Sequence, residues 1–347
     1  MAKTIATSTT SKLLAIDLGY SSVKVAYYNE EGALQFDKYI SAVAKVPDPM
    51  DVDDDVLFQL GIDYYILGTP ALKVARSLLM KLENFEDLKA IYPVWISYLL
   101  KKYGGKEKFD KVIIGLSMAY KDRTDELLQT LQEQLLIETP GYFICLPQGL
   151  SCKLAYEECG LDIRETTKHN DFRMRNYIIL DGGQLTCDIS PTVAGKASAG
   201  AAIGIPNTGT ICISYDVMDY LFKNFEIKIS VKEAQAIVDN DGIFLKRGRE
   251  YNIQTEVSKF TKKYLGNVLK MLEDKYGEYL DAAEGILICG GLAYFFMKYL
   301  EDPDVIKEIE KHFPVSFLHF PPVDAEYFNA YSYLRFVQRL TEKDKKA

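Results

Sequence analysis

The chain has 347 residues, of which 48% are hydrophobic, and this length exceeds that of a usual single-core domain, so we expect two lobes that share a cleft. Its formal net charge of −8 argues against direct nucleic-acid binding, because a DNA-binding surface depends on clustered Lys and Arg. Six cysteines without metal-ligand spacing and three scattered histidines indicate free thiols in a reducing cytoplasm and argue against a zinc site.

The two ends of the sequence are polar. Residues 1–12 lack the apolar core of a signal peptide and the apolar face of a membrane anchor. Residues 341–347 are expected to form a solvated tail, and no run in the chain approaches the length of a membrane span. We therefore expect a cytoplasmic protein without membrane contact.

The first distinctive stretch is Leu14–Val25. An apolar run ends at Asp17, Gly19 follows two residues later, and the hydroxyl of Ser22 comes three residues after that glycine. The pattern predicts a strand, a tight turn and a second strand. Taken alone, it also fits an exposed hairpin turn with a capping Asp.

A small subdomain is expected at about residues 46–108. The segment opens with an exposed acidic loop, contains the single tryptophan, Trp95, and has apolar residues at helical spacing. We expect the loop at 46–55, a strand at 64–68, and helices at 70–82 and 88–103.

Strands and helices then alternate, which predicts an α/β lobe with a mixed sheet. We expect strands at 111–116 and 142–146 and helices at 122–136 and 152–159. Gln148 stands at the end of the second of these strands. The polar, basic segment 164–176 is interpreted as a solvated loop, with contact to a partner as the alternative.

The stretch Tyr177–Asp188 repeats the first pattern and is central to the chain. Its branched apolar run ends at Asp181, and Gly182 and Gly183 permit a tight turn that brings N–H groups close to an anion. The matching positions are Asp17, Gly19, Ser22 and Val25 in the first stretch and Asp181, Gly183, Thr186 and Ile189 in the second. Two hairpins in register indicate an internal duplication with a ligand clamped between the halves.

The second half follows the same alternation after a small, glycine-rich segment at 200–209. We expect helices at 210–225, 231–239, 253–276, 292–300 and 325–340 and strands at 285–289 and 315–320. Gly290 and Gly291 lie between the strand at 285–289 and the next helix. An ordinary strand-to-helix turn also requires glycine at such a position.

These stretches together resemble the actin, Hsp70 and sugar-kinase superfamily. The two hairpins resemble its phosphate loops, and Leu287–Ala293 resembles its adenosine-binding motif. Within the superfamily, the chain is most similar to bacterial actin-like proteins of the ParM type, which segregate plasmids. The resemblance implies an α/β, two-lobed actin-like fold, a duplicated ribonuclease H-like ATPase fold with a nucleotide cleft between the lobes.

The resemblance also implies a domain division. Domain I would span 12–190, with the subdomain inserted at about 46–108, and domain II would span 191–322. A C-terminal helix within 323–340 would return to domain I. Because the inserted subdomain of actin-like proteins forms one side of a filament contact, Trp95 is either part of such a contact or a core residue under a helix.

The resemblance assigns roles to residues around a bound ATP or GTP. The nucleotide-binding residues would be Gly19, Tyr20, Ser21, Ser22 and Lys24 in the first loop, Gly182, Gly183, Gln184, Leu185 and Thr186 in the second, and Gly290, Gly291 and Leu292 in the adenosine motif. Asp17 and Asp181 would repel the phosphates, so their presence implies a Mg²⁺ ion held by both carboxylates through water. Gln148 would join Asp17 and Asp181 as a catalytic residue by orienting the attacking water; alone, it would be an ordinary loop amide.

The function implied is an actin-like nucleotide hydrolase that polymerises and moves plasmid or other DNA through an adaptor protein bound to centromere-like DNA. A sugar-type small-molecule kinase on the same fold, a chaperone and a cell-shape actin are the alternatives. The kinase is disfavoured because no kinase base is recognisable, the chaperone because no peptide-binding domain follows, and the cell-shape actin because the termini are not amphipathic. The sequence contains neither a P-loop nor a Rossmann glycine pattern.

Overall fold

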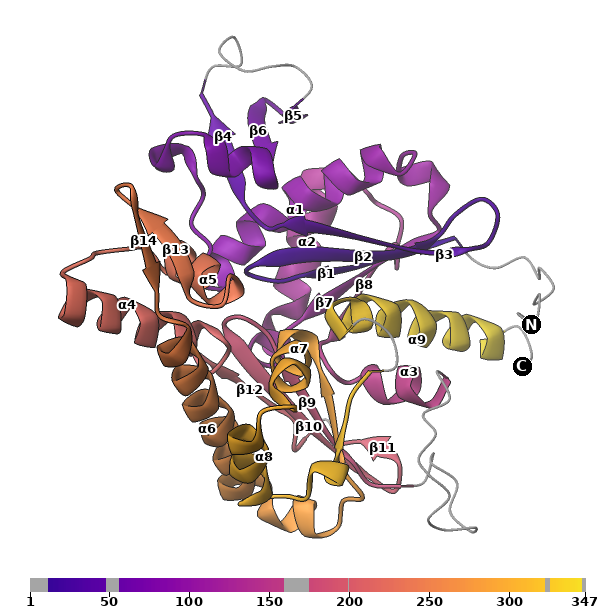
Figure 1. The fold of residues 1–347 in the computed structure, drawn as a ribbon. Coiled ribbons are helices and arrows are strands. Elements are labelled where there is room, and N and C mark those ends of the chain that lie inside the picture. Colours follow the sequence, from indigo (N-terminus) through magenta and orange to yellow (C-terminus); the bar gives the residue numbers. More distant parts are fainter. Residues whose placement is uncertain (1–11, 48–55, 159–174, 199, 322–324, 345–347) are drawn as a thin grey trace. The chain divides into compact units, whose positions relative to one another are not determined.

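The computed structural model describes residues 12–47, 56–158, 175–198, 200–321 and 325–344 (Figure 1). The chain forms two compact units, the first made of Met1–Glu158 with Tyr327–Ala347 and the second of Cys159–Glu326. Most of the expected acidic loop, most of the expected basic loop and both chain ends lie outside the described residues. Within the described ranges, no helix is long and apolar enough to cross a membrane.

A five-stranded mixed sheet forms the centre of the first unit. Its order is β3-β2-β1-β7-β8, with β1 antiparallel to β2 and parallel to β7. The strands are β1 (Leu13–Leu18), β2 (Ser22–Tyr28), β3 (Leu34–Ile40), β7 (Lys111–Leu116) and β8 (Phe143–Pro147). All six residues of β1 are buried, as expected for a strand covered on both faces.

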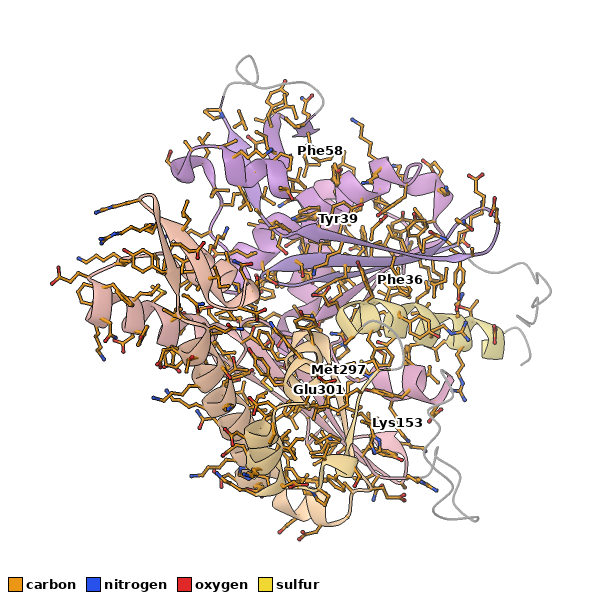
Figure 2. All side chains as sticks on the ribbon, viewed as in Figure 1. Phe36, Tyr39, Phe58, Lys153, Met297 and Glu301 are labelled. Carbon is orange, nitrogen blue, oxygen red and sulfur yellow. The ribbon has the colours of Figure 1, made fainter. Side chains whose placement is uncertain are left out.

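Helices cover both faces of this sheet. They are α1 (Phe85–Lys102), α2 (Thr124–Leu135), α3 (Cys152–Glu158) and α9 (Phe328–Asp344). Leu14 and Ile16 pack in the cluster that includes α1 and α2, and the alternate residues Leu13 and Ala15 pack with α9. At the edge of the sheet, Phe36 packs against α9 residue Tyr331 (Figure 2). The C-terminal helix therefore belongs to the first unit.

A small three-stranded sheet of order β4-β6-β5 lies within the first unit. Its strands are β4 (Val43–Val46), β5 (Leu57–Leu60) and β6 (Asp63–Leu67). Trp95 of α1 is fully buried and its indole donates to the Ser41 carbonyl, so it is a core residue. The helix expected at 70–82 is wrong: only short 3₁₀ turns form at Thr69–Lys73 and Arg76–Leu78. The next residues pair with β4, since the Met80 amide donates to the Val43 carbonyl.

The second unit has a mixed sheet of order β11-β10-β9-β15-β16, with β12 also paired to β10. Its strands are β9 (Ile178–Gly182), β10 (Thr186–Val193), β11 (Lys196–Ala197), β12 (Ile203–Pro206), β15 (Ile286–Cys289) and β16 (Leu318–His319). Only two residues of the strand expected at 315–320 are extended, because Val315–Phe317 forms a 3₁₀ turn. The sequence reading missed β12, whose residues it assigned to a glycine-rich segment.

Five helices and a hairpin complete the described part of the second unit. The helices are α4 (Ile211–Phe225), α5 (Val231–Asp239), α6 (Gln254–Asp281), α7 (Gly290–Tyr299) and α8 (Pro303–Glu310), and the hairpin joins β13 (Ile243–Lys246) to β14 (Arg249–Asn252). α5 begins with a capping box made by Ser230 and Glu233. α8 and the hairpin were absent from the sequence reading.

The two large sheets share one plan. In each, a hairpin is followed by two parallel strands added on the side of its first strand. Leu18 pairs with Val23 in one hairpin, and Gly182 pairs with Cys187, each 164 positions later, in the other. The internal duplication read from the sequence therefore extends to strand order and register. The expected boundary at 190 differs from the division at 158, because β9 and β10 belong to the sheet of the second unit.

Candidate functional site

The first candidate turn, in the first unit, lies between β1 and β2. Asp17, near the end of β1, pairs in register with Lys24 of β2, and only 3% of its surface is exposed. The Lys24 ammonium lies 3.5 Å from one Asp17 carboxylate oxygen, and the Gln148 side-chain amide donates to the other at 2.9 Å. The first unit therefore brings together a buried carboxylate, a cation from the same hairpin and an amide that is distant in sequence.

Gln148 reaches Asp17 because β8 delivers it to the same edge of the sheet. The backbone amide of Gln148 donates to the Leu116 carbonyl at 2.8 Å, which continues the pairing of β8 with β7 beyond Pro147. Since β1, β7 and β8 are parallel neighbours, their carboxyl ends lie together. The topology thus gathers Asp17 and Gln148 although 131 residues separate them.

The turn itself is closed by its glycine. The Gly19 amide donates to the Ser22 carbonyl at 3.0 Å, so this N–H is already used inside the turn. Among the described residues, none accepts a hydrogen bond from the amides of Tyr20 and Ser21, at the tip of the turn. These two amides, with the neighbouring Lys24 ammonium, are the donors that the first turn offers to an anion.

Tyr20 also fixes the turn to its surroundings. Its hydroxyl donates to the Tyr120 hydroxyl at 3.3 Å, and Tyr120 packs against Phe85 at the start of α1. Burial raises the pKa of Tyr20 far above its ordinary value, so the phenol is neutral at all physiological pH values. A neutral phenol adds no negative charge beside Asp17.

A second candidate turn, in the second unit, lies between β9 and β10 and repeats the first. Asp181 is 4% exposed, and the Gly183 amide donates to the Thr186 carbonyl at 2.9 Å. The following amides, of Gln184 and Leu185, have no acceptor in the part of the chain that the structure describes. The register position of Lys24 is occupied here by the buried Asp188, so the second turn lacks the cation of the first.

Glycines allow α7 to begin directly against Asp181. Gly290 has φ +70°, and a Cβ atom there would lie 2.3 Å from an Asp181 carboxylate oxygen and 2.8 Å from the Gly182 carbonyl oxygen. A Cβ on Gly182 would lie 2.3 Å from the Leu292 side chain. Gly291 is less crowded, with its nearest atom at 3.6 Å. Gly182, Gly290 and Leu292 therefore set how closely the helix approaches the carboxylate.

The start of α4 is hydrogen-bonded to the second turn, and this contact was not predicted from the sequence. The amides of Gly209, Thr210 and Ile211 donate in turn to the carbonyls of Leu185, Gly183 and Gln184, at 3.3, 3.1 and 2.9 Å. A Cβ on Gly209 would lie 2.3 Å from the Gln184 carbonyl oxygen. The signal available in the sequence was this glycine directly before an apolar helical pattern.

The donor set fits a magnesium ion bound with a phosphate better than a metal held by protein alone. No cluster of three or more His, Cys, Asp or Glu side chains that could hold a metal occurs among the described residues. Mg²⁺ in nucleotide sites takes one or two carboxylates, keeps several waters and completes its shell with phosphate oxygens. Asp17 in the first unit and Asp181 in the second are each a buried carboxylate at a turn, which is the type of protein ligand that such an ion takes.

Comparison with protein-family models and with curated protein sequences finds no match. Comparison with solved structures finds ParM proteins and archaeal actin homologues at low identity. A 15-stranded ParM filament from Clostridium botulinum is 15% identical, with TM-score 0.68 over 95% of this chain and 100% of that chain. Bacillus thuringiensis ParM with AMPPNP is 16% identical, with TM-score 0.60 over 96% and 100%. An archaeal actin homologue with ADP is 14% identical, with TM-score 0.64 over 94% and 99%.

Proposed function

Because this chain has the two-lobed α/β fold of the ParM-type actin-like proteins, we propose that it is a nucleotide-dependent, filament-forming ATPase. The observation that carries the proposal is the repeated turn, with a buried Asp followed by a glycine-closed loop in the same register in both units. ParM and archaeal actin homologues of this fold bind ADP or AMPPNP, and one assembles into filaments.

In this proposal, the two turns hold the phosphates of ATP, and GTP is the alternative nucleotide. The amides of Tyr20 and Ser21 and those of Gln184 and Leu185 donate to phosphate oxygens, while Gly19 and Gly183 shape the turns. Lys24 adds the cation of the first turn, and the hydroxyls of Ser22 and Thr186 lie at the start of the return strands. Fixed amides and one ammonium bind a polyanion without much reorganisation.

The adenosine is proposed to lie at the start of α7. Gly291 is partly exposed there and leaves room for a ring against the backbone. Gly290 and Leu292 are buried, so they would act by holding the start of α7 in place rather than by touching the ring. Mg²⁺, held through water by Asp17 and Asp181, would neutralise charge on the phosphates. Without the ion, the two carboxylates would oppose nucleotide binding.

Gln148 is proposed to orient the attacking water. Its amide contacts Asp17 at 2.9 Å, so it lies beside the group that would hold the ion. A Gln is a weak base, but positioning accounts for most of the catalysis of phosphoryl transfer when the transition state is loose. Asp17 then has two tasks, to hold the ion and to fix the Gln148 side chain.

The cellular role we propose is segregation of plasmid or other DNA in the cytoplasm. The negative net charge of the chain supports an indirect connection, in which an adaptor protein binds both the filament and centromere-like DNA. The chain itself would then contact other copies of itself and the adaptor.

Sedimentation with ATP, GTP, AMPPNP, ADP and no nucleotide, followed by electron microscopy of the pellets, tests the proposal. We expect polymer with ATP and with AMPPNP and little polymer without nucleotide, because filaments grow by a head-to-tail contact that depends on the bound nucleotide. Phosphate release should accompany assembly with ATP. A protein that stays monomeric at tens of micromolar in every nucleotide state would favour a small-molecule kinase instead.

A further inference from the structure

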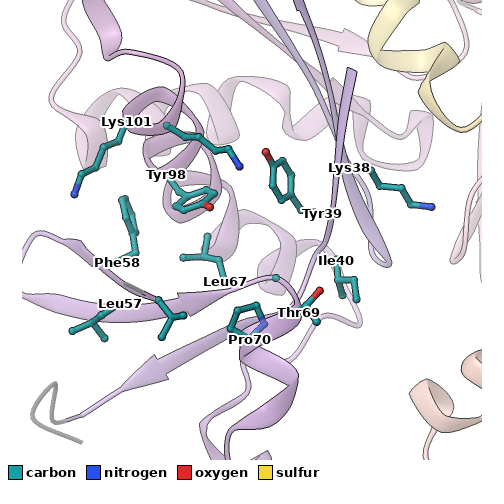
Figure 3. A pocket seen from close by; sticks show the side chains of 13 residues that line it. Lys38, Tyr39, Ile40, Leu57, Phe58, Leu67, Thr69, Pro70, Tyr98 and Lys101 are labelled. Atoms are coloured by element: carbon teal, nitrogen blue, oxygen red, sulfur yellow. The ribbon is translucent and has the colours of Figure 1, made fainter. Parts of the chain in front are cut away.

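A cavity of about 830 Å³ opens in the first unit where the small sheet, α1 and the end of β3 meet (Figure 3). Its wall includes Tyr39, Phe58 and Tyr98, and the Tyr98 ring stands nearly perpendicular to the other two, with centroids 6.3 and 5.6 Å away. This volume suits a drug-sized molecule or a few side chains of a peptide. None of these residues belongs to the candidate nucleotide site.

Two lysines of the last turn of α1 border the cavity. The Lys101 ammonium lies 5.9 Å from the Phe58 ring centre, and the Lys102 ammonium lies 4.7 Å from that of Tyr39. Neither lysine forms a salt bridge with a described carboxylate. A hydrogen bond with Tyr39 raises the pKa of Lys102, and the nearby Asp37 carboxylate raises it further. The cavity therefore combines an aromatic wall with two ammonium groups. Lys102 has the Asp37 carboxylate nearby, and Lys101 has no carboxylate partner among the described residues.

Lysines at a helix C-terminus commonly serve only to stabilise the helix dipole. Here the end of α1 is already capped, because the amides of Tyr103 and Gly105 donate to the carbonyls of Leu99 and Leu100 at 2.9 and 2.7 Å. Two apolar residues that line the cavity, Ile40 and Val56, also remain 40% and 37% exposed. These features favour a ligand that is both apolar and anionic.

The strand beside the cavity favours an extended ligand. Among the described residues β5 is an outer strand that pairs with β6 alone, and its residues Leu57 and Phe58 line the cavity. An outer strand presents backbone N–H and C=O groups that an extended peptide can pair with, while side chains of the peptide enter adjacent pockets. A compact small molecule would leave this edge unused.

We propose that the cavity binds an acidic peptide segment of a partner protein. One aromatic or large apolar side chain of the peptide enters the cavity and packs against the partly exposed rings of Tyr39 and Tyr98, and flanking carboxylates pair with Lys101 and Lys102. This inference is independent of the proposed nucleotide chemistry.

Fluorescence anisotropy of a labelled peptide, Asp-Glu-Phe-Glu-Asp, with the full chain tests the proposal. Because the chain carries a net charge of −8, unspecific attraction of an acidic peptide is not expected. We expect saturable binding that Lys101→Glu weakens by roughly tenfold, as for a charge facing the ligand. Lys106→Glu, the same charge change at an exposed residue that does not line the cavity, should alter affinity by less than about twofold.

Replacing the peptide's Phe by Ala should also abolish measurable binding. The proposal is overturned by no binding at about 1 mM chain, or by equal losses in the Lys101 and Lys106 variants. Binding of N-acetylphenylalanine as tight as that of the peptide would indicate a small-molecule site, and loss of sedimenting polymer in Lys101→Glu would indicate a contact between copies; both contradict it. If Lys101→Glu does not fold, Lys101→Met, which keeps the apolar stem, must still weaken binding at least about threefold.

Discussion

Replacing Gly290 by Ala should destabilise the second unit. At φ +70°, an L-residue costs roughly 1–2 kcal/mol relative to glycine. The new Cβ would also lie 2.3 Å from an Asp181 oxygen and 2.8 Å from the Gly182 carbonyl oxygen. The carboxylate can rotate away, but the backbone carbonyl of β9 cannot, so a packing cost of about 1–3 kcal/mol is added. We expect a total loss of roughly 2–5 kcal/mol.

Gly291→Ala is the matched control. Its Cβ would meet nothing closer than 3.6 Å and its backbone is not left-handed, so the substitution should be neutral or stabilising by up to about 1 kcal/mol. Urea denaturation followed by far-ultraviolet circular dichroism compares the two variants. Fluorescence of Trp95, which lies in the first unit, separates the unfolding of that unit from the loss in the second. Equal midpoints for the two variants would refute the assigned crowding of Gly290.

Three further predictions concern single side chains. Gln148→Ala should lower phosphate release by roughly 10²-fold with little change in nucleotide affinity, leaving filaments that persist when ATP is exhausted; wild-type phosphate release would remove Gln148 from the mechanism. Asp181→Asn should abolish Mg²⁺-dependent hydrolysis while the circular dichroism spectrum is retained, and unchanged turnover at saturating Mg-ATP would reject that site. A hydrogen bond with Lys246 lowers the pKa of Glu233 from 4.5 to about 2. The contribution of the ionised Glu233 carboxylate to folding stability is therefore present above pH 4.5 and is lost as pH falls towards 2. Because the side chain is 34% exposed, Glu233→Gln should cost only about 1 kcal/mol in urea denaturation at pH 6, and a difference that persists undiminished at pH 2 would contradict this reasoning.

Local patterns allowed correct prediction of the elements that the chain encodes within a short window. The two turns could be predicted because Asp, Gly and a hydroxyl residue recur at fixed spacing. The structure has the same repeat in its strand register, in which Asp17 pairs with Lys24 and Asp181 pairs with Asp188. The strand at 111–116 and the helix at 231–239 were predicted with their observed bounds. A short run of branched apolar residues marks the strand and a capping box marks the helix, without help from the rest of the fold.

Elements that depend on distant partners, or whose local signal is weak, were missed. Residues 70–82 have helical spacing, yet Leu79 and Met80 pair with β4, and this tertiary pairing overrides the local preference. The β13–β14 hairpin has a two-residue turn, Arg247-Gly248, in which both residues have positive φ, and only the glycine signalled it. The Gln148 contact with Asp17 arises from the order of parallel strands, which no short window contains.

The attachment of the second turn to α4 has a mechanical consequence. Because the carbonyls of Gly183 and Gln184 accept hydrogen bonds from the first amides of the helix, the turn cannot shift without tilting α4. A helix of 15 residues is about 22 Å long, so a tilt of roughly 5° at the turn displaces its far end by about 2 Å. That far end carries Phe222 and Phe225, which are 50% and 43% exposed. A small movement at the turn therefore produces a larger displacement of the apolar surface at the far end of α4.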